Sequence, residues 1–234
     1  MKYAFVDYRI SDEEFNNLSK LNCNIIKCEP SNKLYDAICG HPDILIHFID
    51  KSKIIIHKDT SKEFEEMLIN LNFEVIRSIN SISDKYPNDI ILNAINTTSS
   101  FIHNLKYTDP VLLKEVVNKK AINVNQGYSK CSTVVINDSA FITSDKSIYS
   151  ALKSNNYDVL LLEPGNISLP GLNYGFIGGT CGMLDSNTIV FYGSLEKHPQ
   201  YLEIKNFLSK YEITPIYLSN ETLIDRGSIF FTDI

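Results

Sequence analysis

The sequence of 234 residues lacks both long hydrophobic runs and an excess of basic charge. No apolar stretch approaches the ~18 residues of a membrane-spanning helix, and Met1–Asp7 shows no signal-peptide hydrophobic segment. Lysine and arginine total 22 against 28 aspartate and glutamate residues, so the net charge is −6. A nucleic-acid-binding face is normally basic. We therefore expect a cytoplasmic protein with neither a membrane nor a nucleic-acid partner.

Cysteine and histidine are scarce, and their spacing argues against disulfide and metal motifs. The five cysteines are an odd number without a C-x-x-C pair, which fits a reduced cytoplasm better than a disulfide framework. The five histidines form no H-x-H or H-E-x-x-H motif, so we expect no metal centre. The glycine-rich run Gly175–Gly182 has no Walker lysine. We expect no cofactor, and an open α/β protein that binds a nucleotide through these glycines stays a third hypothesis.

The sequence does contain one structural unit repeated five times. Helix-start signals recur roughly every 40 to 50 residues, and each predicted helix is followed by a predicted strand. Four of the helices are preceded by two strands joined through a turn rich in Asp, Asn, Ser or Thr. These strand pairs are Asp43–Asp50 with Lys53–Lys58, Asp89–Ile95 with Ser100–Leu105, Ser132–Asn137 with Ala140–Ser144, and Cys181–Asp185 with Thr188–Gly193.

The two ends of the chain complement each other. The first helix, at Ser11, has one strand before it, Lys2–Asp7, and the missing partner strand lies in Ser228–Thr232. Pairing these strands would close five ββαβ units into a pseudo-fivefold α/β ring, which removes open sheet edges. An open sheet of βαβ units is the alternative. No linker composition divides the chain, so we expect a single domain over residues 1–234.

Five ββαβ units closed head to tail resemble the pentein superfamily of guanidino-group-modifying proteins. The resemblance covers the whole chain in pattern but rests on short motifs. The sequence looks like an uncharacterised bacterial branch of this superfamily, a domain of unknown function. Its most specific motif is Gly40-His-Pro-Asp43, which is similar to the Gly-His-x-Asp motif of agmatine deiminases. In that family the histidine is the general acid and base, and the aspartate binds the guanidinium.

Two further motifs carry the resemblance to the agmatine and arginine deiminases. Their nucleophilic cysteine begins a strand two units after the histidine unit, and Cys131 stands at that place here. At the place of their Glu-Gly-Gly motif, one unit ahead of the histidine, this chain has Asp225-Arg-Gly227, which offers a carboxylate but has Asp in place of Glu and Arg in place of the first Gly. Because the cysteine unit is the last one in the deiminases, the resemblance implies a circular permutant. In the usual linear order the nucleophile would be missing and the protein inactive.

The resemblance implies roles for these residues in thiol chemistry. Cys131 would attack the guanidinium carbon, and His41 would protonate the leaving amine and then activate water. Asp43 and Asp225 would hold the guanidinium through paired hydrogen bonds. An ammonium at Lys130 would lower the pKa of Cys131 if it faced the sulfur. The catalytic candidates are Cys131, His41 and Asp225; the substrate-binding candidates are Asp43, Lys130, Ser132, Gly179, Cys181 (also a reserve nucleophile), Gly182 and Gly227.

The sequence leaves two main functions open. One is a thiol-dependent hydrolase or transferase that acts on a small guanidine or amidine compound. The other is a catalytically inactive binding module of the same fold, with a protein or small-molecule partner. An isolated cysteine beside a strand is commonly a buried core residue, His41 could serve only to shape the turn before Pro42, and Asp225 could be a turn aspartate. The departure from Glu-Gly-Gly and the different position at which the ring is cut favour the binding module.

Overall fold

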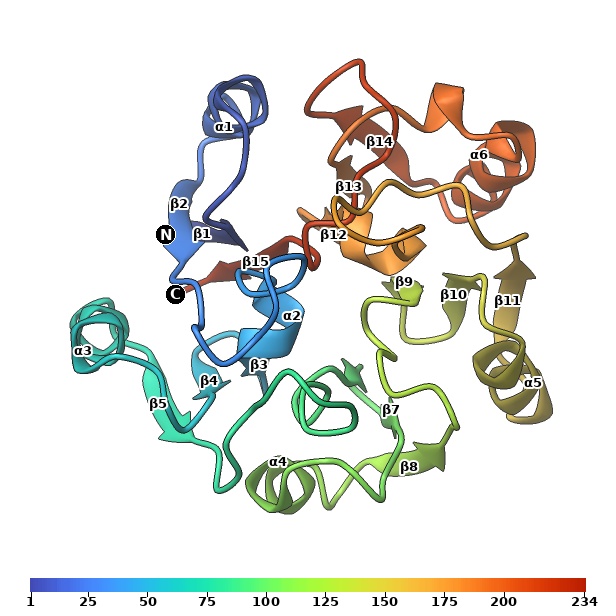
Figure 1. Cartoon of the computed structure of the whole chain (residues 1–234). Helices are drawn as coiled ribbons and strands as arrows, with labels where there is room; N and C mark the ends of the chain where they lie inside the picture. The colour runs from blue at the N-terminus through green and yellow to red at the C-terminus, as the bar shows by residue number, and fades with distance from the viewer.

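The chain forms five three-stranded sheets arranged around a common centre (Figure 1). A computed structural model describes residues 1–234. In every sheet the first strand is antiparallel to the second, and the second is parallel to the third. A helix connects the second strand to the third in each case. The ββαβ unit and the pseudo-fivefold ring predicted from the sequence are therefore confirmed.

The sheets have the strand orders β15-β1-β2, β3-β4-β5, β6-β7-β8, β9-β10-β11 and β12-β13-β14. The strands are β1 Lys2–Asp7, β2 Asn24–Cys28, β3 Ile46–Phe48, β4 Lys53–Ile56, β5 Glu74–Arg77, β6 Ile95–Asn96, β7 Ser100–His103, β8 Lys120–Asn123, β9 Thr133–Asn137, β10 Ala140–Thr143, β11 Asp158–Leu161, β12 Cys181–Met183, β13 Thr188–Phe191, β14 Thr214–Tyr217 and β15 Phe230–Asp233. The helices are α1 Asp12–Ser19, α2 Pro42–Leu45, α3 Lys62–Asn70, α4 Pro110–Glu115, α5 Lys146–Ser154 and α6 Tyr201–Lys210, with short 3₁₀ turns η1 Ile177–Thr180 and η2 Leu195–Lys197.

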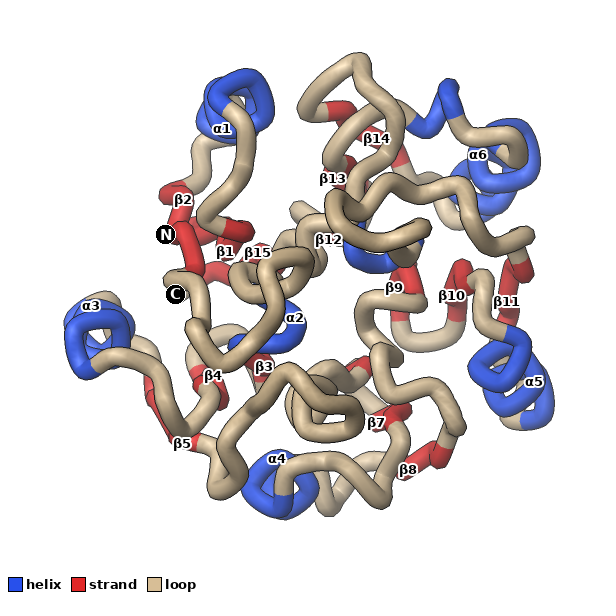
Figure 2. The backbone as a smooth tube through the Cα atoms, viewed as in Figure 1, coloured by secondary structure: helices blue, strands red, loops and turns tan.

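The two ends of the chain meet in one sheet. Strand β15 pairs antiparallel with β1, so that Lys2 lies opposite Asp233 and Phe5 opposite Phe230. The amino terminus of Met1 donates a hydrogen bond to the carbonyl of Ile234, and Figure 2 shows the two ends beside each other. The fifth unit is therefore built from both ends of the chain, as the sequence predicts.

Side-chain caps explain where most of the connecting helices begin. Ser11 and Glu14 form a capping box at α1, and Ser61, Asp109 and Asp145 accept backbone N–H bonds at the starts of α3, α4 and α5. Such caps satisfy N–H groups that have no partner within the helix. The helices α1, α3, α4, α5 and α6 lie on the outside of the ring, whereas α2 and the first strand of each unit lie near its centre (Figures 1 and 2).

Two predicted strands are wrong over much of their length. Residues 42–45 form the short helix α2, because a proline suits the first helical position, and only Ile46–Phe48 is a strand there. Between Asp89 and Ala94 the chain makes turns, and strand pairing begins at Ile95. A short buried apolar run does not by itself distinguish a strand from other structure. Neither segment joins a sheet: the first is a short helix, and the second is irregular backbone.

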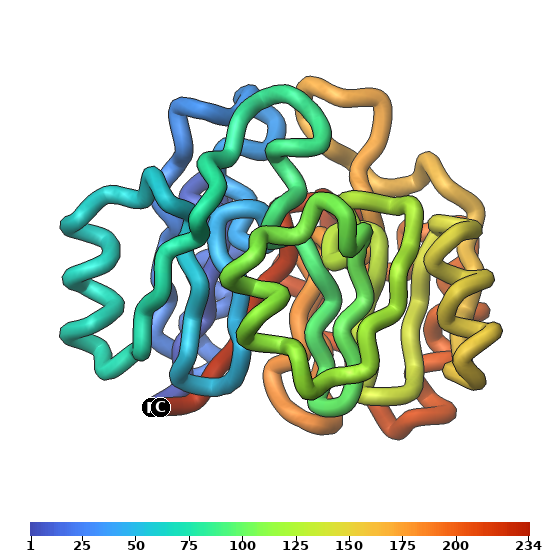
Figure 3. The backbone as a smooth tube through the Cα atoms, turned by 90° about the horizontal axis from the view of Figure 1, so that it is seen from below, coloured from blue at the N-terminus to red at the C-terminus, as the bar shows by residue number.

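The longest connections gather at one end of the ring. Figure 3 shows residues 29–41, 78–94 and 162–176 projecting beyond the strands at the same end, while the chain termini lie at the opposite end. Loops of this length usually carry function on a rigid scaffold. None of the helices combines the length and the apolar character that crossing a membrane requires.

Candidate active site

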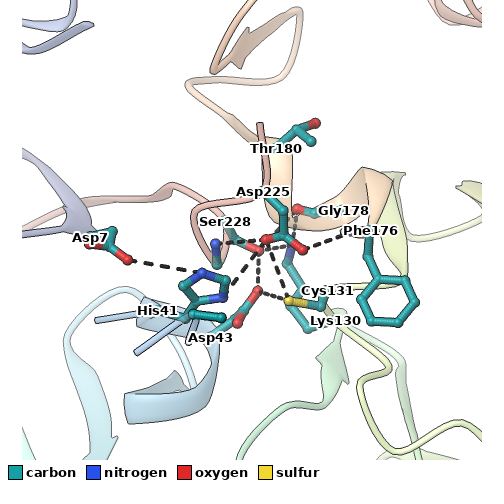
Figure 4. A network of polar contacts seen from close by, with 12 residues as sticks. Asp7, His41, Asp43, Lys130, Cys131, Phe176, Gly178, Thr180, Asp225 and Ser228 are labelled. Atoms are coloured by element: carbon teal, nitrogen blue, oxygen red, sulfur yellow. Dashed lines mark hydrogen bonds and ion pairs between the residues drawn. The ribbon is translucent and has the colours of Figure 1, made fainter. Parts of the chain in front are cut away.

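The starts of the five units meet at the centre of the ring (Figure 4). They supply residues 225–228 before β15, residues 41–43 at α2, Asn93 before β6, residues 130–131 before β9 and residues 178–180 at η1. Hydrogen bonds join these segments to one another. Because the segments are far apart in the sequence, the cluster exists only when the ring is closed.

The thiol of Cys131 lies between two buried carboxylates (Figure 4). Its Sγ donates to Asp43 Oδ2 at 3.0 Å and lies 3.9 Å from Asp225 Oδ1. Burial, followed by the negative charges of Asp225 and Asp43, raises the pKa of the Cys131 thiol well above its ordinary value. The structure therefore holds Cys131 as a neutral thiol that donates a hydrogen bond to Asp43.

His41 stands beside the thiol and between two carboxylates. Its Nδ1 is 3.8 Å from Asp225 Oδ1 and its Nε2 is 4.0 Å from Asp7 Oδ2. One ring nitrogen of His41, the Sγ of Cys131 and one carboxylate oxygen of Asp43 all lie within 4.8 Å of one another. The imidazole therefore faces the thiol, at a distance that a small movement or one water would bridge.

Asp225 is fixed by backbone donors. Phe176 N donates to its Oδ2 at 2.9 Å and Gly227 N donates to its Oδ1 at 3.0 Å. A Cβ at Gly179 would lie 1.9 Å from Asp225 Oδ1, so the carboxylate needs a glycine there. Burial raises the pKa of Asp225, although His41 and the two N–H donors act in the opposite direction. The local fold thus holds a carboxylate in a place where it is poorly solvated.

The side chain of Asn93 links Asp43 to the backbone at Cys131, and the sequence analysis did not predict this role. Its Nδ2 donates to the carbonyl and to the Oδ1 of Asp43, both at 3.0 Å. Its Oδ1 accepts from the backbone N–H of Lys130 at 2.9 Å and of Cys131 at 3.1 Å. The side chain of Asn93 thus makes four hydrogen bonds that set Cys131 and Asp43 relative to each other. Asp7 and Ser228 were also missed; Ser228 Oγ donates to Asp43 Oδ2 at 2.7 Å.

Lys130 does not activate the thiol in the expected way. Its Nζ donates to Ser228 Oγ at 2.9 Å and lies 5.7 Å from the centroid of the Phe230 ring. Its charge lowers the pKa of Cys131, but by less than burial and the carboxylates raise it. The condition set for a lowered pKa of Cys131, an ammonium that faces the sulfur, is not met here: burial and the two carboxylates outweigh one ammonium that is held on Ser228.

The remaining candidates fall into two groups. Gly227, like Gly179, packs against the cluster: its φ is +70°, and a Cβ there would lie 2.2 Å from the Cβ of His41. Cys181 and Gly182 instead line a separate cavity between the first strands, and burial raises the pKa of Cys181 to about 12. The carbonyl of Ser132 accepts from Thr143 Oγ1, and Ser132 does not line the cavity that reaches Cys131.

A cavity of about 270 Å³ opens above the cluster. Cys131, His41 and Asp225 lie along it, and its walls come from residues 35–44, Tyr128 and residues 169–176. Two of these segments belong to the long connections at one end of the ring (Figure 3). A small molecule that enters the cavity would therefore reach the thiol directly.

The cluster also offers a set of metal ligands. His41, Asp43 and Cys131 are all buried and present a nitrogen, an oxygen and a sulfur within 4.8 Å of one another. Zinc accepts these three donor types. The expectation of a centre without metal stays a prediction.

Comparison with solved structures defines the class of protein. The structure of dimethylarginine dimethylaminohydrolase from Pseudomonas aeruginosa, in complex with citrulline, matches with a TM-score of 0.54 at 8% identity, covering 94% of this chain and 92% of that chain. A dimethylarginine dimethylaminohydrolase adduct with 4-chloro-2-hydroxymethylpyridine gives a TM-score of 0.58 at the same identity and coverage. SxtG, an amidinotransferase from Microseira wollei, gives 0.56 at 8% identity, covering 96% of this chain and 89% of that chain. The protein thus has the pentein fold.

Sequence comparison gives the particular family. The model of a family of unknown function (DUF6873) matches residues 5–230, and the protein belongs to that family. No curated protein matches the sequence. The pentein-like branch of unknown function that the sequence predicts is therefore confirmed.

Proposed function

We propose that the protein acts on a small guanidine or amidine compound by thiol chemistry, as a hydrolase or a transferase. The arrangement that carries the proposal is the Cys131 thiol, 3.0 Å from Asp43 and 3.9 Å from Asp225 with His41 beside it. A planar cation with several N–H donors suits a pair of carboxylates. The structural neighbours named for acting on dimethylarginine or for transferring amidino groups support this class of substrate.

In this proposal the substrate itself activates the nucleophile. Burial and then the carboxylates of Asp225 and Asp43 raise the pKa of Cys131, and a cation bound between the carboxylates would offset their charges. The pKa of the thiol then falls in the complex, and His41 takes its proton. Without a cation the thiol stays protonated and poorly reactive, which protects it from unrelated electrophiles.

The bond changes follow from these positions. Sγ of Cys131 forms a bond to the central carbon, and His41 returns a proton to the leaving amine as its C–N bond breaks. In a hydrolase, His41 then removes a proton from water that attacks the same carbon, and the C–S bond breaks. In a transferase, an acceptor amine takes the place of water. Asp43 and Asp225 hold the remaining nitrogens throughout.

A binding module without catalysis is the second candidate. The thiol of Cys131 is 3% exposed, and its pKa is raised well above the ordinary value. Such a cysteine can serve as a neutral hydrogen-bond donor to Asp43 alone. In that case the same cavity would bind a cation and release it unchanged.

Labelling with a haloacetamidine separates the two candidates, since this reagent joins a cationic amidine to a carbon that thiolates alkylate. We expect the wild type to be labelled at Cys131, as mapped by peptide mass spectrometry. Cys131→Ala should lose that label and lower turnover by at least about 10³-fold, as loss of a nucleophile does. Cys23→Ala, which removes the half-buried cysteine before β2, is the matched control and should change neither.

Two results would contradict the proposal that the protein is an enzyme. A label that survives Cys131→Ala would place the reactive thiol elsewhere. A wild-type protein that binds guanidine compounds, detected as a thermal shift, but is never labelled at Cys131 would instead establish the binding module.

A further inference from the structure

The walls of the cavity above Cys131 carry no charge. Of the residues that line it, the only ionisable ones other than tyrosines are Cys131, His41 and Asp225, which form the reactive cluster. No lysine or arginine reaches the cavity. The walls are Tyr35, Ile38, Ile44, Tyr128, Leu169, Leu172, Asn173, Tyr174 and Phe176.

Aromatic rings form one wall next to the thiol. The rings of Tyr128 and Phe176 lie 6.0 Å apart with an interplanar angle of 31°, and Tyr174 packs edge-on against Phe176 at 6.4 Å. The hydroxyl of Tyr128 donates to Asp89. The hydroxyl of Tyr128 is therefore already hydrogen-bonded, and Tyr128 lines the cavity with its ring. Phe176 also donates its backbone N–H to Asp225, which ties this wall to the cluster.

The cations near the site are already paired with protein groups. Arg9 is held by Asp7, Arg226 lies 3.0 Å from Glu14, and Lys130 donates to Ser228. None of these three side chains lines the cavity, so its walls offer no cation to a substrate carboxylate. Asp225 is the only carboxylate that lines the cavity, and Asp89, whose Oδ2 accepts from Tyr128, does not line it. The walls beyond the reactive cluster therefore hold no carboxylate for a substrate ammonium. A charged group placed there without a partner would lose its hydration uncompensated.

From this wall we infer the substrate class within the proposed function, on which the inference rests. The cationic head binds at Asp43 and Asp225, and the rest of the substrate is uncharged and apolar. The substrates are N-alkyl or N-aralkyl guanidines or amidines, and amino-acid guanidines such as arginine are excluded. Asn173 is the one uncharged amide on the wall.

Protection of Cys131 against a haloacetamidine tests the inference without requiring turnover. The competing ligands are butylguanidine, benzylguanidine, agmatine and 4-guanidinobutyrate. Butylguanidine and agmatine differ only in a terminal ammonium. We expect butylguanidine and benzylguanidine to protect half of the thiol at concentrations at least about tenfold lower than the two charged ligands.

A designed charge on the wall sharpens the test. Leu172 lines the cavity and is 49% exposed, so Leu172→Glu can place a carboxylate at its edge without burying it. We expect this variant to improve protection by agmatine about tenfold relative to butylguanidine. Leu202→Glu on α6, at a leucine that is 66% exposed and outside the cavity, should leave the preference unchanged.

The possible outcomes distinguish failure of this inference from failure of the proposed function on which it rests. Equal or better protection by agmatine or 4-guanidinobutyrate would overturn the apolar substrate class while leaving the thiol chemistry standing. If Leu172→Glu leaves the preference for butylguanidine over agmatine unchanged, the uncharged wall does not select the substrate, and the inference fails. Failure of the reagent to label Cys131 at all would overturn the proposed function, and the inference with it.

Discussion

At the scale of single residues, Asn93 sets the geometry of the site. It is fully buried, and its amide faces Asp43 with its donor side and the backbone of residues 130–131 with its acceptor side. An aspartate has the same shape but no donor. At position 93 it would keep the two N–H bonds and bring a second carboxylate to about the 3.0 Å that now separates the amide from Asp43 Oδ1.

Asn93→Asp should therefore make folding stability depend on pH. Two carboxylates at this distance share a proton, so one of the pair has a folded-state pKa raised above its unfolded value. A raised pKa gives stability that is present at low pH and lost as pH rises. We expect urea unfolding to show a loss on the order of 2 kcal/mol at pH 8 and a smaller loss at pH 5.

Asn125→Asp, at an exposed asparagine, is the control and should change little at either pH. A loss for Asn93→Asp that is the same at pH 5 and pH 8 would mean that Asp43 does not sense the new carboxylate.

The sequence pointed to some of these residues and missed others for a physical reason. His41 and Asp43 belong to a short motif with a known chemical use, and Cys131 and Asp225 were found by their place in the repeated unit. Asn93 lies in an apolar stretch that resembles a strand, and nothing local marks it. Its partners come from two other units, so its role depends on ring geometry that local pattern does not encode.

At the scale of elements, the turn before β15 and the start of α2 are interlocked. Gly227 has a φ of +70°, its carbonyl accepts from Asp43 N at 3.0 Å, and a Cβ on it would overlap His41. Ser228 follows with a φ of +72°, a conformation that costs a non-glycine residue roughly 1 kcal/mol. The turn is thus strained where it shapes the site.

Gly227→Ala, compared with a control, should separate the free-energy cost of overlap with His41 from the cost of a positive φ. Alanine at a positive φ costs about 1 kcal/mol, and overlap with His41 adds a further ~1–3 kcal/mol. Gly165→Ala is the matched control, because Gly165 has a φ of +99° and nothing within 4 Å of the added Cβ.

In chemical denaturation we expect Gly165→Ala to lower the free energy of unfolding only by the cost of the positive φ. The labelling rate of Cys131 should stay unchanged in this variant. Gly227→Ala should lose both stability and labelling. Equal effects of the two substitutions would show that Gly227 is required for its φ alone.

Helix starts and most strand starts were predictable at this scale, whereas the starts of two strands were not. Ser11, Ser61, Asp109 and Asp145 mark four helices because a cap acts within one turn of the backbone. The strands expected at Asp43 and Asp89 begin later than predicted, because buried apolar residues there pack without joining a ladder.

At the scale of the whole molecule, the ring determines the site, and the position of the chain ends does not. The ends lie in the paired strands β1 and β15, on the side of the ring opposite the long connections (Figure 3). The circular permutation relative to the deiminases and the single domain over residues 1–234 stay predictions. The same geometry allows the ends to be moved experimentally.

A permuted chain should therefore keep its site. We expect a protein with residue 234 joined to residue 1 by a linker of about four residues, and opened at the exposed turn Asp185–Asn187, to fold and to be labelled at Cys131 at a rate within about threefold of the wild type. Circular dichroism would confirm folding. A control opened between Ile91 and Leu92, beside Asn93, should lose labelling, and a folded first permutant without labelling would contradict this picture.

The most direct test of the central claim compares the labelling rates of Cys131 with a haloacetamidine and with the uncharged haloacetamide of the same size. Because burial, together with Asp225 and Asp43, raises the pKa of the free thiol, the amide should react slowly at pH 8 and faster as pH rises beyond 9. The amidine cation offsets those carboxylates and should react at least about a hundredfold faster at pH 8. Equal rates for the two reagents at pH 8 would contradict the proposal that a cation bound between Asp43 and Asp225 activates Cys131.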